Sequence, residues 1–193
     1  MSVIRAFIAI ELPAEIQENL DQISTQLKQR LNDLPVRWVP GKNMHLTLKF
    51  LGDVSVANIG MLQEVLQTEA AAVRSFEFSV GTIGAFPNAQ RPRVVWIGIE
   101  APPELAALQA SLENHLARLG YSREERPFSP HLTLGRVSRS ASSTEVRQIG
   151  EAVQSCRVGF LGAACVQEIH LYKSDLKPGG SVYTCLFSAN LAA

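Results

Sequence analysis

The tetrapeptide His-Leu-Thr-Leu occurs twice in this chain of 193 residues, at positions 45–48 and again at 131–134. Chance would supply about 0.002 copies in a chain of this composition, so the recurrence indicates a duplicated unit. A second segment supports the duplication, because residues 7–11 align with residues 96–100 at a spacing that also superimposes Pro13 on Pro102. We therefore expect two copies of one strand-helix-strand unit, each carrying the same polar residues at equivalent points.

Hydrophobic periodicity places both motifs on strands. Residues 44–51 and 131–137 are rich in strand-forming residues, and we expect Gly52-Asp53 to end the first of these strands. Apolar residues at helical spacing follow Pro13 and Pro102-Pro103. The remaining strands are predicted at 3–10, 76–80, 93–99, 160–166, 168–173 and 182–187, with a turn at 178–180 and further helices near 59–73 and 144–153.

Residues i and i+2 of a strand share a face. His45 and Thr47 should therefore point one way while Leu46 and Leu48 point into a core. The same holds for His131 and Thr133, which alternate with Leu132 and Leu134. An amphipathic edge strand would show this pattern once, but it does not explain why the same polar pair recurs.

Two imidazoles facing one cleft suit general acid–base catalysis, because near pH 7 one can accept a proton while the other donates one. Threonine hydroxyls beside them can donate hydrogen bonds to the oxygens of a phosphodiester. A metal site is the rival interpretation, but two histidines without a carboxylate or cysteine at ligand spacing leave the coordination shell too empty. We expect no metal and no cofactor, and the residues alone do not decide which histidine is the acid.

Composition limits the classes of partner. Lys+Arg and Asp+Glu are both 18, so the formal charge is zero, and a protein that coats a nucleic-acid duplex is disfavoured. Nucleic acid is not excluded as a substrate, because an enzyme that binds only one terminus needs just a few local cations. Three cysteines without a CxxC pair favour a reducing cytoplasm, and we expect neither a signal peptide nor a membrane span.

Two His-x-Thr-x motifs in a duplicated chain of this size resemble the 2H phosphoesterase superfamily. The flanking segments are similar to its LigT/ThpR branch, the RNA 2′,3′-cyclic phosphodiesterases. The matching stretches are residues 5–13, 43–52, 93–98, 126–136 and 171–176, followed by Gly180 and Tyr183. The resemblance runs from residue 5 to about residue 190.

The resemblance implies an α+β fold of two pseudo-symmetric lobes, each a mostly antiparallel sheet backed by helices, with the motifs facing each other across a cleft. Residues 1–193 would form one domain with interleaved chain segments. The implied reaction is hydrolysis of an RNA terminal 2′,3′-cyclic phosphate to a 2′-phosphomonoester, in some members with reversible 2′–5′ joining of RNA ends. By motif position His45 would donate a proton to O3′ and His131 would activate water, while Thr47 and Thr133 hold the phosphate.

Several further residues are weaker candidates. Arg136 follows the second motif and could add a cation to the phosphate pocket, although strict alternation puts it on the face of Leu132 and Leu134, so a bend is needed. Phe50 at the equivalent place is expected in the core, with base stacking as the alternative. The other candidates are Arg5, Arg91, Arg93, Ser174 and Tyr183 at the cleft, while His115 and His170 are expected to be surface or packing residues.

The expected partners are RNA ends or small nucleotides that bear a 2′,3′-cyclic phosphate, with no membrane and no obligate protein partner. Two alternatives stay open. The same chemistry could act on another small cyclic nucleotide, or the cleft could serve a non-catalytic nucleotide-binding module. The presence of both histidines and both threonines favours catalysis.

Overall fold

The computed structural model describes residues 2–32, 34–178 and 180–193. Its strands are β1 (Val3–Glu11), β2 (Val36–Trp38), β3 (His45–Ser55), β4 (Phe76–Phe86), β5 (Val94–Glu100), β6 (His131–Val137), β7 (Gly162–Val166), β8 (Glu168–Lys177) and β9 (Gly180–Asn190). Its helices are α1 (Ala14–Leu31), α2 (Ile59–Ala71), α3 (Pro103–Arg118) and α4 (Ser143–Ser155), with short 3₁₀ turns η1 (Gly41–Asn43) and η2 (Val56–Asn58). The α+β class expected from the sequence is confirmed.

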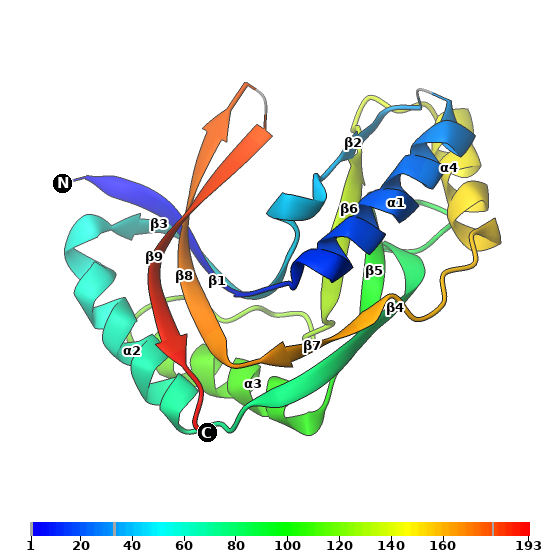
Figure 1. The fold of residues 1–193 in the computed structure, drawn as a ribbon. Coiled ribbons are helices and arrows are strands. Elements are labelled where there is room, and N and C mark those ends of the chain that lie inside the picture. The colour runs from blue at the N-terminus through cyan, green and yellow to red at the C-terminus, as the bar shows by residue number, and fades with distance from the viewer. Residues whose placement is uncertain (1, 33, 179) are drawn as a thin grey trace.

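The strands form two separate sheets. One sheet has the order β3-β1-β8-β9 and the other has the order β2-β6-β5-β4-β7. Every pairing between neighbouring strands is antiparallel. The chain places β1 in the first sheet, β2 in the second and β3 in the first again (Figure 1). It then forms β4 to β7 in the second sheet and returns to the first for β8 and β9.

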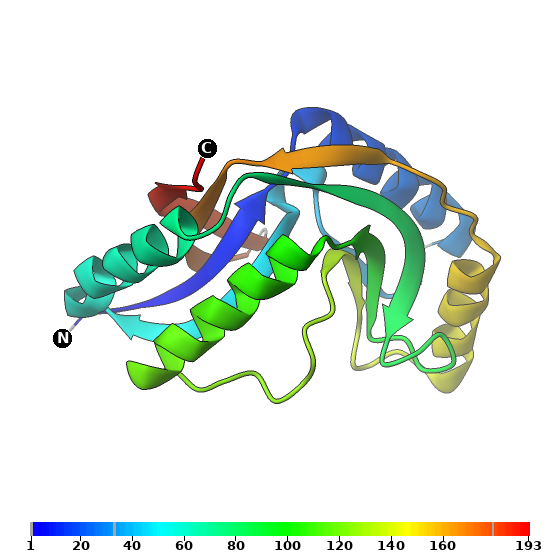
Figure 2. The same ribbon diagram turned by 90° about the horizontal axis from the view of Figure 1, so that it is seen from below.

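Each sheet is covered by two helices, and the helices of the two repeated units are exchanged. Helices α2 and α3 contact each other and cover the first sheet, as Figure 2 shows, while α1 and α4 pack on the second. The helix that follows β1 therefore covers the other sheet, and the helix that follows β5 covers the sheet of β1. We call the first sheet with α2 and α3 the first lobe, and the second sheet with α1 and α4 the second lobe.

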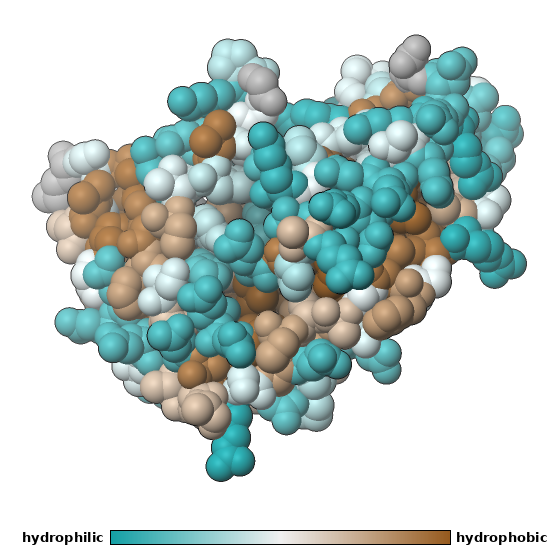
Figure 3. Space-filling view, in the orientation of Figure 1, coloured by the Kyte–Doolittle hydropathy of each residue, from teal (hydrophilic) through white to brown (hydrophobic). Residues whose placement is uncertain are grey.

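Amphipathic helices hold each lobe together. Leu105, Leu108, Leu112 and Leu116 of α3 are all completely buried, as their spacing predicts. Burial of one such side chain contributes about 1.5–3 kcal/mol. Helix α1 buries its Ile and Leu stripe in the same way, while its polar outer face forms much of the hydrophilic surface in Figure 3.

Several strands run further than the sequence predicts: β8 extends to Lys177, and β9 covers Gly180–Asn190. In β3 and β4 the pairing continues through local irregularities. The expected end at Gly52 is wrong: Gly52 adopts a φ of 69°, which suits glycine, and β3 goes on to Ser55 beyond a register shift. Likewise β4 continues past Val80 to Phe86 through a register shift between Gly81 and Ile83. Of the turn predicted at 178–180, Gly179 lies outside the described residues.

None of the helices in the described ranges is both long enough and apolar enough to cross a membrane.

Candidate active site

The two motifs open the strands β3 and β6, which belong to different sheets. His45 is the first residue of β3 and pairs with Glu11 of β1, and His131 is the first residue of β6 and pairs with Gly98 of β5. Although the sheets differ, β3 and β6 contact each other. The fold therefore brings the two copies of the motif to the junction of the lobes.

Burial along both strands follows the expected alternation. Leu46, Leu48, Leu132 and Leu134 are buried in the core, whereas the histidines and threonines between them are only partly covered. The polar side chains of each motif share one face of their strand. The first seven residues of the two strands have the same burial pattern, residue by residue.

A β-bulge follows the threonine in each motif. The pairing with β1 passes from Thr47 directly to Lys49, so Leu48 is the extra residue, and the pairing with β5 passes from Thr133 to Gly135 across Leu134. The alternation is therefore inverted beyond each bulge. Phe50 is 67% exposed instead of packed in the core as expected. Arg136 is also exposed, because the bulge supplies the bend that strict alternation lacks.

The residue after the first bulge ties the motif strand to a helix. Lys49 is buried, and its Nζ donates to Glu113 Oε2 at 2.7 Å and to the carbonyl oxygen of Ser122. Because Glu113 and the Ser122 carbonyl both accept hydrogen bonds from it, the charge of the buried Lys49 ammonium is compensated. The ion pair fixes β3 against α3 directly beside Thr47.

Aromatic rings surround His45. The imidazole stacks on Phe7 with ring centroids 4.6 Å apart, and Tyr183 meets it edge-on at 5.1 Å. Tyr172 stacks on Phe7 at 5.3 Å. Burial, helped by the charge of Glu11, raises the pKa of Tyr172 above its usual value, so this phenol keeps its proton at neutral pH.

The surroundings of His45 favour its neutral form. Burial lowers the pKa of this imidazole from 6.5 to about 4, against an opposing hydrogen bond to the backbone of Asn43. His45 is therefore a neutral imidazole, with a single ring proton, at neutral pH in the free protein.

His131 is held in the same way. Its Nδ1 lies 2.7 Å from the carbonyl oxygen of Ser129, two residues earlier in the chain. His45 makes the equivalent hydrogen bond to the backbone of Asn43, also two residues earlier. Because a carbonyl only accepts, Nδ1 carries the proton and Nε2 is left with a free lone pair. Burial lowers the pKa of His131, the Ser129 bond opposes this, and the charge of Arg136 lowers it further.

The other candidates from the sequence are dispersed. Tyr183 reaches His45, but Arg91 and Arg93 line a separate groove with Pro87 and Gln90, and Arg93 donates to the Ser138 carbonyl at 3.2 Å. Arg5 lies on β1 opposite Asp53 of β3. Ser174 lies on β8 opposite Tyr183 of β9. The packing roles expected for the two other histidines fit the structure, because His115 pairs with Glu69 and His170 is buried against Ser188.

The sequence does not single out Phe7 or Arg37, which the structure places next to His45 and Arg136, respectively. Phe7 lies in a continuously apolar strand and is itself buried. It nevertheless does not belong to the core cluster that contains its neighbours Ala6 and Ile8. Arg37 lies on the three-residue strand β2, where it pairs with Arg136. No local signal marks Arg37, because only the pairing of β2 with β6 brings it opposite Arg136.

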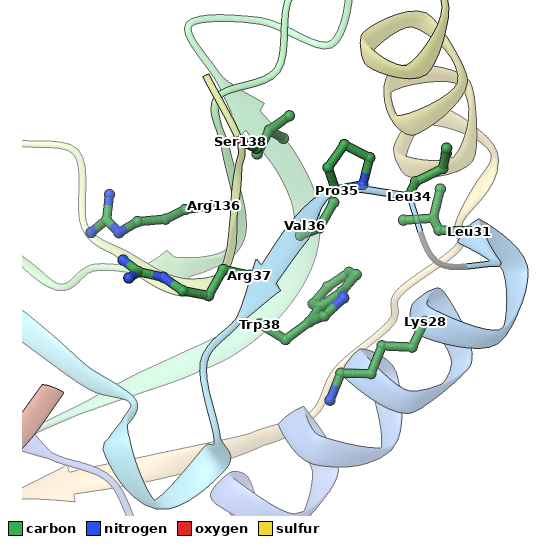
Figure 4. A pocket seen from close by; sticks show the side chains of 10 residues that line it. Lys28, Leu31, Leu34, Pro35, Val36, Arg37, Trp38, Arg136 and Ser138 are labelled. Carbon is green, nitrogen blue, oxygen red and sulfur yellow. The ribbon is translucent and has the colours of Figure 1, made fainter. Parts of the chain in front are cut away.

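A groove of about 740 Å³ runs between α1 and β2, and Figure 4 shows its lining. Trp38 and Lys28 face each other inside it, with the Lys28 ammonium 6.0 Å from the indole. Arg37 and Arg136 extend together from its edge, away from α1. The two motif histidines do not line this groove, so it borders the site and does not contain it.

In the part of the chain that the structure describes, no three His, Cys, Asp or Glu side chains gather in a way that could hold a metal ion.

The interleaved lobes and the paired motifs define a class of two-lobed phosphoesterases, and comparison with known proteins agrees. The family model of LigT-like phosphoesterases matches residues 10–96 and, a second time, residues 97–183. The chain belongs to the LigT-like phosphoesterase family. The two matches divide the chain between the duplicated units seen in the sequence.

Relatives cover nearly the whole chain. The protein named RNA 2′,3′-cyclic phosphodiesterase of Methanothermobacter thermautotrophicus is 34% identical over 94% of this chain and 95% of its own. The Escherichia coli protein of the same name is 35% identical over 94% of this chain and 93% of its own.

Solved structures share the fold. TT0787 of Thermus thermophilus superimposes with a TM-score of 0.80 at 27% identity, over 97% of each chain. Escherichia coli LigT in complex with 3′-AMP gives a TM-score of 0.77 at 30% identity, over 100% of each chain.

Proposed function

We propose that this protein hydrolyses the terminal 2′,3′-cyclic phosphate of RNA to a 2′-phosphomonoester. The observation that carries the proposal is the duplicated site: two His-x-Thr pairs with the same burial, the same bulge and the same backbone bond, on strands that contact each other. The relatives that carry the name RNA 2′,3′-cyclic phosphodiesterase support the choice of substrate.

His131 is the general base of the proposed reaction. With Nδ1 bonded to Ser129, its Nε2 can take a proton from a water molecule. The water oxygen attacks phosphorus, and the bond from phosphorus to O3′ breaks. The phosphate stays on O2′ as a monoester, and Thr47 and Thr133 donate hydrogen bonds to its oxygens.

His45 is the general acid, and it gives its proton to O3′ as that bond breaks. Burial keeps His45 neutral in the free protein, so it must gain this proton when the substrate binds. The negative charge of the bound phosphate raises the pKa of His45, because a nearby opposite charge favours the protonated imidazole. Protonation of His45 is thereby coupled to occupancy of the site.

The two lobes act as one catalytic unit over residues 1–193 in this proposal, because each supplies one histidine and one threonine. We further propose a cytoplasmic location, which is supported by three free cysteines, Cys156, Cys165 and Cys185. The expected partner is an RNA end, with no obligate protein partner. Reversible 2′–5′ joining of RNA ends belongs to the same proposal.

The test is incubation of an oligoribonucleotide ending in a 2′,3′-cyclic phosphate, with EDTA present, followed by identification of the product isomer. The proposal predicts a 2′-phosphate and no dependence on divalent metal. A 3′-phosphate would show that O2′, not O3′, is the leaving group. Binding without hydrolysis of any cyclic phosphate would show a nucleotide-binding module, and hydrolysis of cyclic mononucleotides alone would show a different substrate.

A further inference from the structure

Cys185 of β9 has a buried histidine beside its thiol. Its Sγ lies 3.9 Å from Nδ1 of His170, which is buried on β8, and 3.6 Å from Oγ of Ser188. The pairing of β9 with β8 skips Leu186, which forms a bulge. Because the bulge inverts the alternation, Cys185 and Ser188 face the same side of the sheet although they are three residues apart. His170 is therefore flanked by a thiol and a hydroxyl.

His170 is placed to take a proton from this thiol. The carboxylate of Glu168 lies 3.8 Å from Nε2 and favours a proton on that nitrogen, which leaves Nδ1 as an acceptor. The hydroxyl of Ser188 lies 2.9 Å from Nδ1, and the Phe187 carbonyl oxygen is a second acceptor for the thiol at 3.5 Å. A nucleophile next to a base that a third group orients is the arrangement that activates cysteine side chains.

Cys185 also ends a row of aromatic residues that crosses the first sheet. β9 is the outer strand of this sheet (Figure 1). Residues opposite each other on neighbouring strands share a face. Because Phe7 belongs to the row, the row lies on the face where His45 stacks on Phe7. From β3 to β9, the residues that oppose one another are Phe50, Phe7, Tyr172 and Cys185.

The thiol lies close to two of the rings near the proposed acid. Cys185 and Tyr183 are two residues apart on β9, so their side chains share a face at a separation of roughly 7 Å. Tyr172 lies about 5 Å away across the pairing with β8. Since Tyr183 meets His45 edge-on, a group attached to Sγ would cover the approach to that imidazole. Cys185 is exposed, so such a group can reach it from solvent.

The other two cysteines lack this environment. Cys165 is also exposed, but it lies in the second lobe on β7, opposite Glu77 of β4. Within the ranges that the structure describes, no hydrogen bond joins Cys156 or Cys165 to a histidine. The neighbouring imidazole, and not exposure alone, therefore distinguishes Cys185.

We propose that Cys185 is a modification site, where a low-molecular-weight disulfide forms a mixed disulfide that obstructs the approach of RNA to His45. The thiol proton passes to Nδ1 of His170, and Sγ attacks one sulfur of the reagent R–S–S–R. The bond between Sγ and that sulfur forms while the S–S bond of the reagent breaks. The leaving thiolate takes the proton from His170 and departs as R–SH, and a free thiol reverses the reaction. The loss of activity rests on the proposed function, whereas the modification itself does not.

The modification is tested by incubating the reduced protein with glutathione disulfide and mapping the modified peptides by mass spectrometry. We expect one glutathione per chain, on Cys185, attached about tenfold faster than on Cys165. Glu168→Gln removes the charge beside His170 from a half-exposed side chain, and it should slow the reaction of Cys185 about threefold. Equal rates at Cys185 and Cys165 would overturn the proposal, because exposure alone would then explain both.

The effect on the site is measured with the oligoribonucleotide that ends in a 2′,3′-cyclic phosphate. We expect kcat/KM to fall about tenfold in the modified protein, because the adduct keeps the RNA end from its reactive position, and to return on reduction with dithiothreitol. Cys185→Ser replaces only the sulfur, so it should retain activity and lose the response to glutathione disulfide. Cys165→Ser is the matched control and should retain both. Unchanged activity of the modified protein, or inhibition that persists in Cys185→Ser, would overturn the proposal.

A binding measurement separates this proposal from the proposed function. The affinity for adenosine 2′-phosphate is compared before and after treatment with glutathione disulfide, for the unsubstituted protein and for Cys185→Ser. We expect the treatment to weaken binding about tenfold in the unsubstituted protein only. If cyclic phosphates were not hydrolysed but this difference persisted, the hydrolytic function would fail while the modification site stood. Equal affinity before and after modification would overturn the obstruction that we assign to Cys185.

Discussion

The imidazole of His45 lies nearly parallel to the ring of Phe7, with centroids 4.6 Å apart and an angle of 24° between the planes. Tyr172 is nearly parallel to both rings, at 5.3 Å from Phe7 and 6.3 Å from His45. These rings keep water from one side of the imidazole, which is the physical cause of its lowered pKa. Phe7 is therefore a positioning residue for the proposed acid.

Substitution of Phe7 by leucine should raise the pKa of His45 toward 6.5, because loss of the ring lets water reach the imidazole. The free energy of unfolding should fall by about 1–2 kcal/mol. NMR titration of the His45 ring protons measures the change. Phe160→Leu serves as the control because Phe160 is exposed in the loop before β7, and an unchanged His45 pKa in folded Phe7→Leu would contradict the role given to Phe7.

Burial of neutral His45 should make stability depend on pH. The pKa is about 4 in the folded protein and near 6.5 in the unfolded chain, so between these values the unfolded state binds more protons. The contribution of neutral His45 to the free energy of unfolding is complete above pH 6.5 and is lost as the pH falls toward 4. The free energy of unfolding, measured with urea, should fall between pH 7 and pH 4.5 in the unsubstituted protein. In His45→Gln this fall should be about 2 kcal/mol smaller. Parallel pH curves for the two proteins would be inconsistent with a buried neutral His45.

Loss of a threonine hydroxyl should impair catalysis less than loss of a histidine. Thr47→Val and Thr133→Val keep the shape of the side chain but remove one donor to the phosphate, and we expect kcat/KM to fall by about 10- to 100-fold. Thr47→Ser and Thr133→Ser retain the hydroxyl and should recover most of the activity. If serine and valine variants were equally impaired, packing and not hydrogen bonding would explain the two threonines.

Phe50 is available for base stacking, since it is 67% exposed and its centroid lies 6.1 Å from that of Phe7. Stacking of a base on an aromatic ring contributes about 1–3 kcal/mol. Phe50→Ala should therefore raise KM for an RNA end about tenfold with little change in kcat. Steady-state kinetics of Phe50→Ala test this, with Phe160→Ala as the control for loss of an exposed aromatic ring. A KM of Phe50→Ala equal to that of Phe160→Ala would exclude a base contact at Phe50.

Alternation correctly predicts from the sequence that His45 shares a strand face with Thr47, and His131 with Thr133, because side chains two residues apart lie on the same side of a strand. It fails directly after each motif, since hydrophobic patterns do not encode the bulges at Leu48 and Leu134. Phe50 is misplaced for that reason. The burial of Lys49 was equally hidden, because its partner Glu113 comes from α3, far along the chain. Residues that depend on long-range pairing, as Arg37 does, leave no local pattern to find.

The central claim is that one histidine from each motif transfers a proton in the same reaction. Single-turnover rates on an oligoribonucleotide with a 2′,3′-cyclic phosphate, measured for the unsubstituted protein, His45→Ala and His131→Ala, test it most directly. Each substitution should lower the rate by about 10²–10⁴ while the circular dichroism of the folded protein is preserved. If one variant kept a rate close to that of the unsubstituted protein while the other was inactive, the two-histidine mechanism would be contradicted.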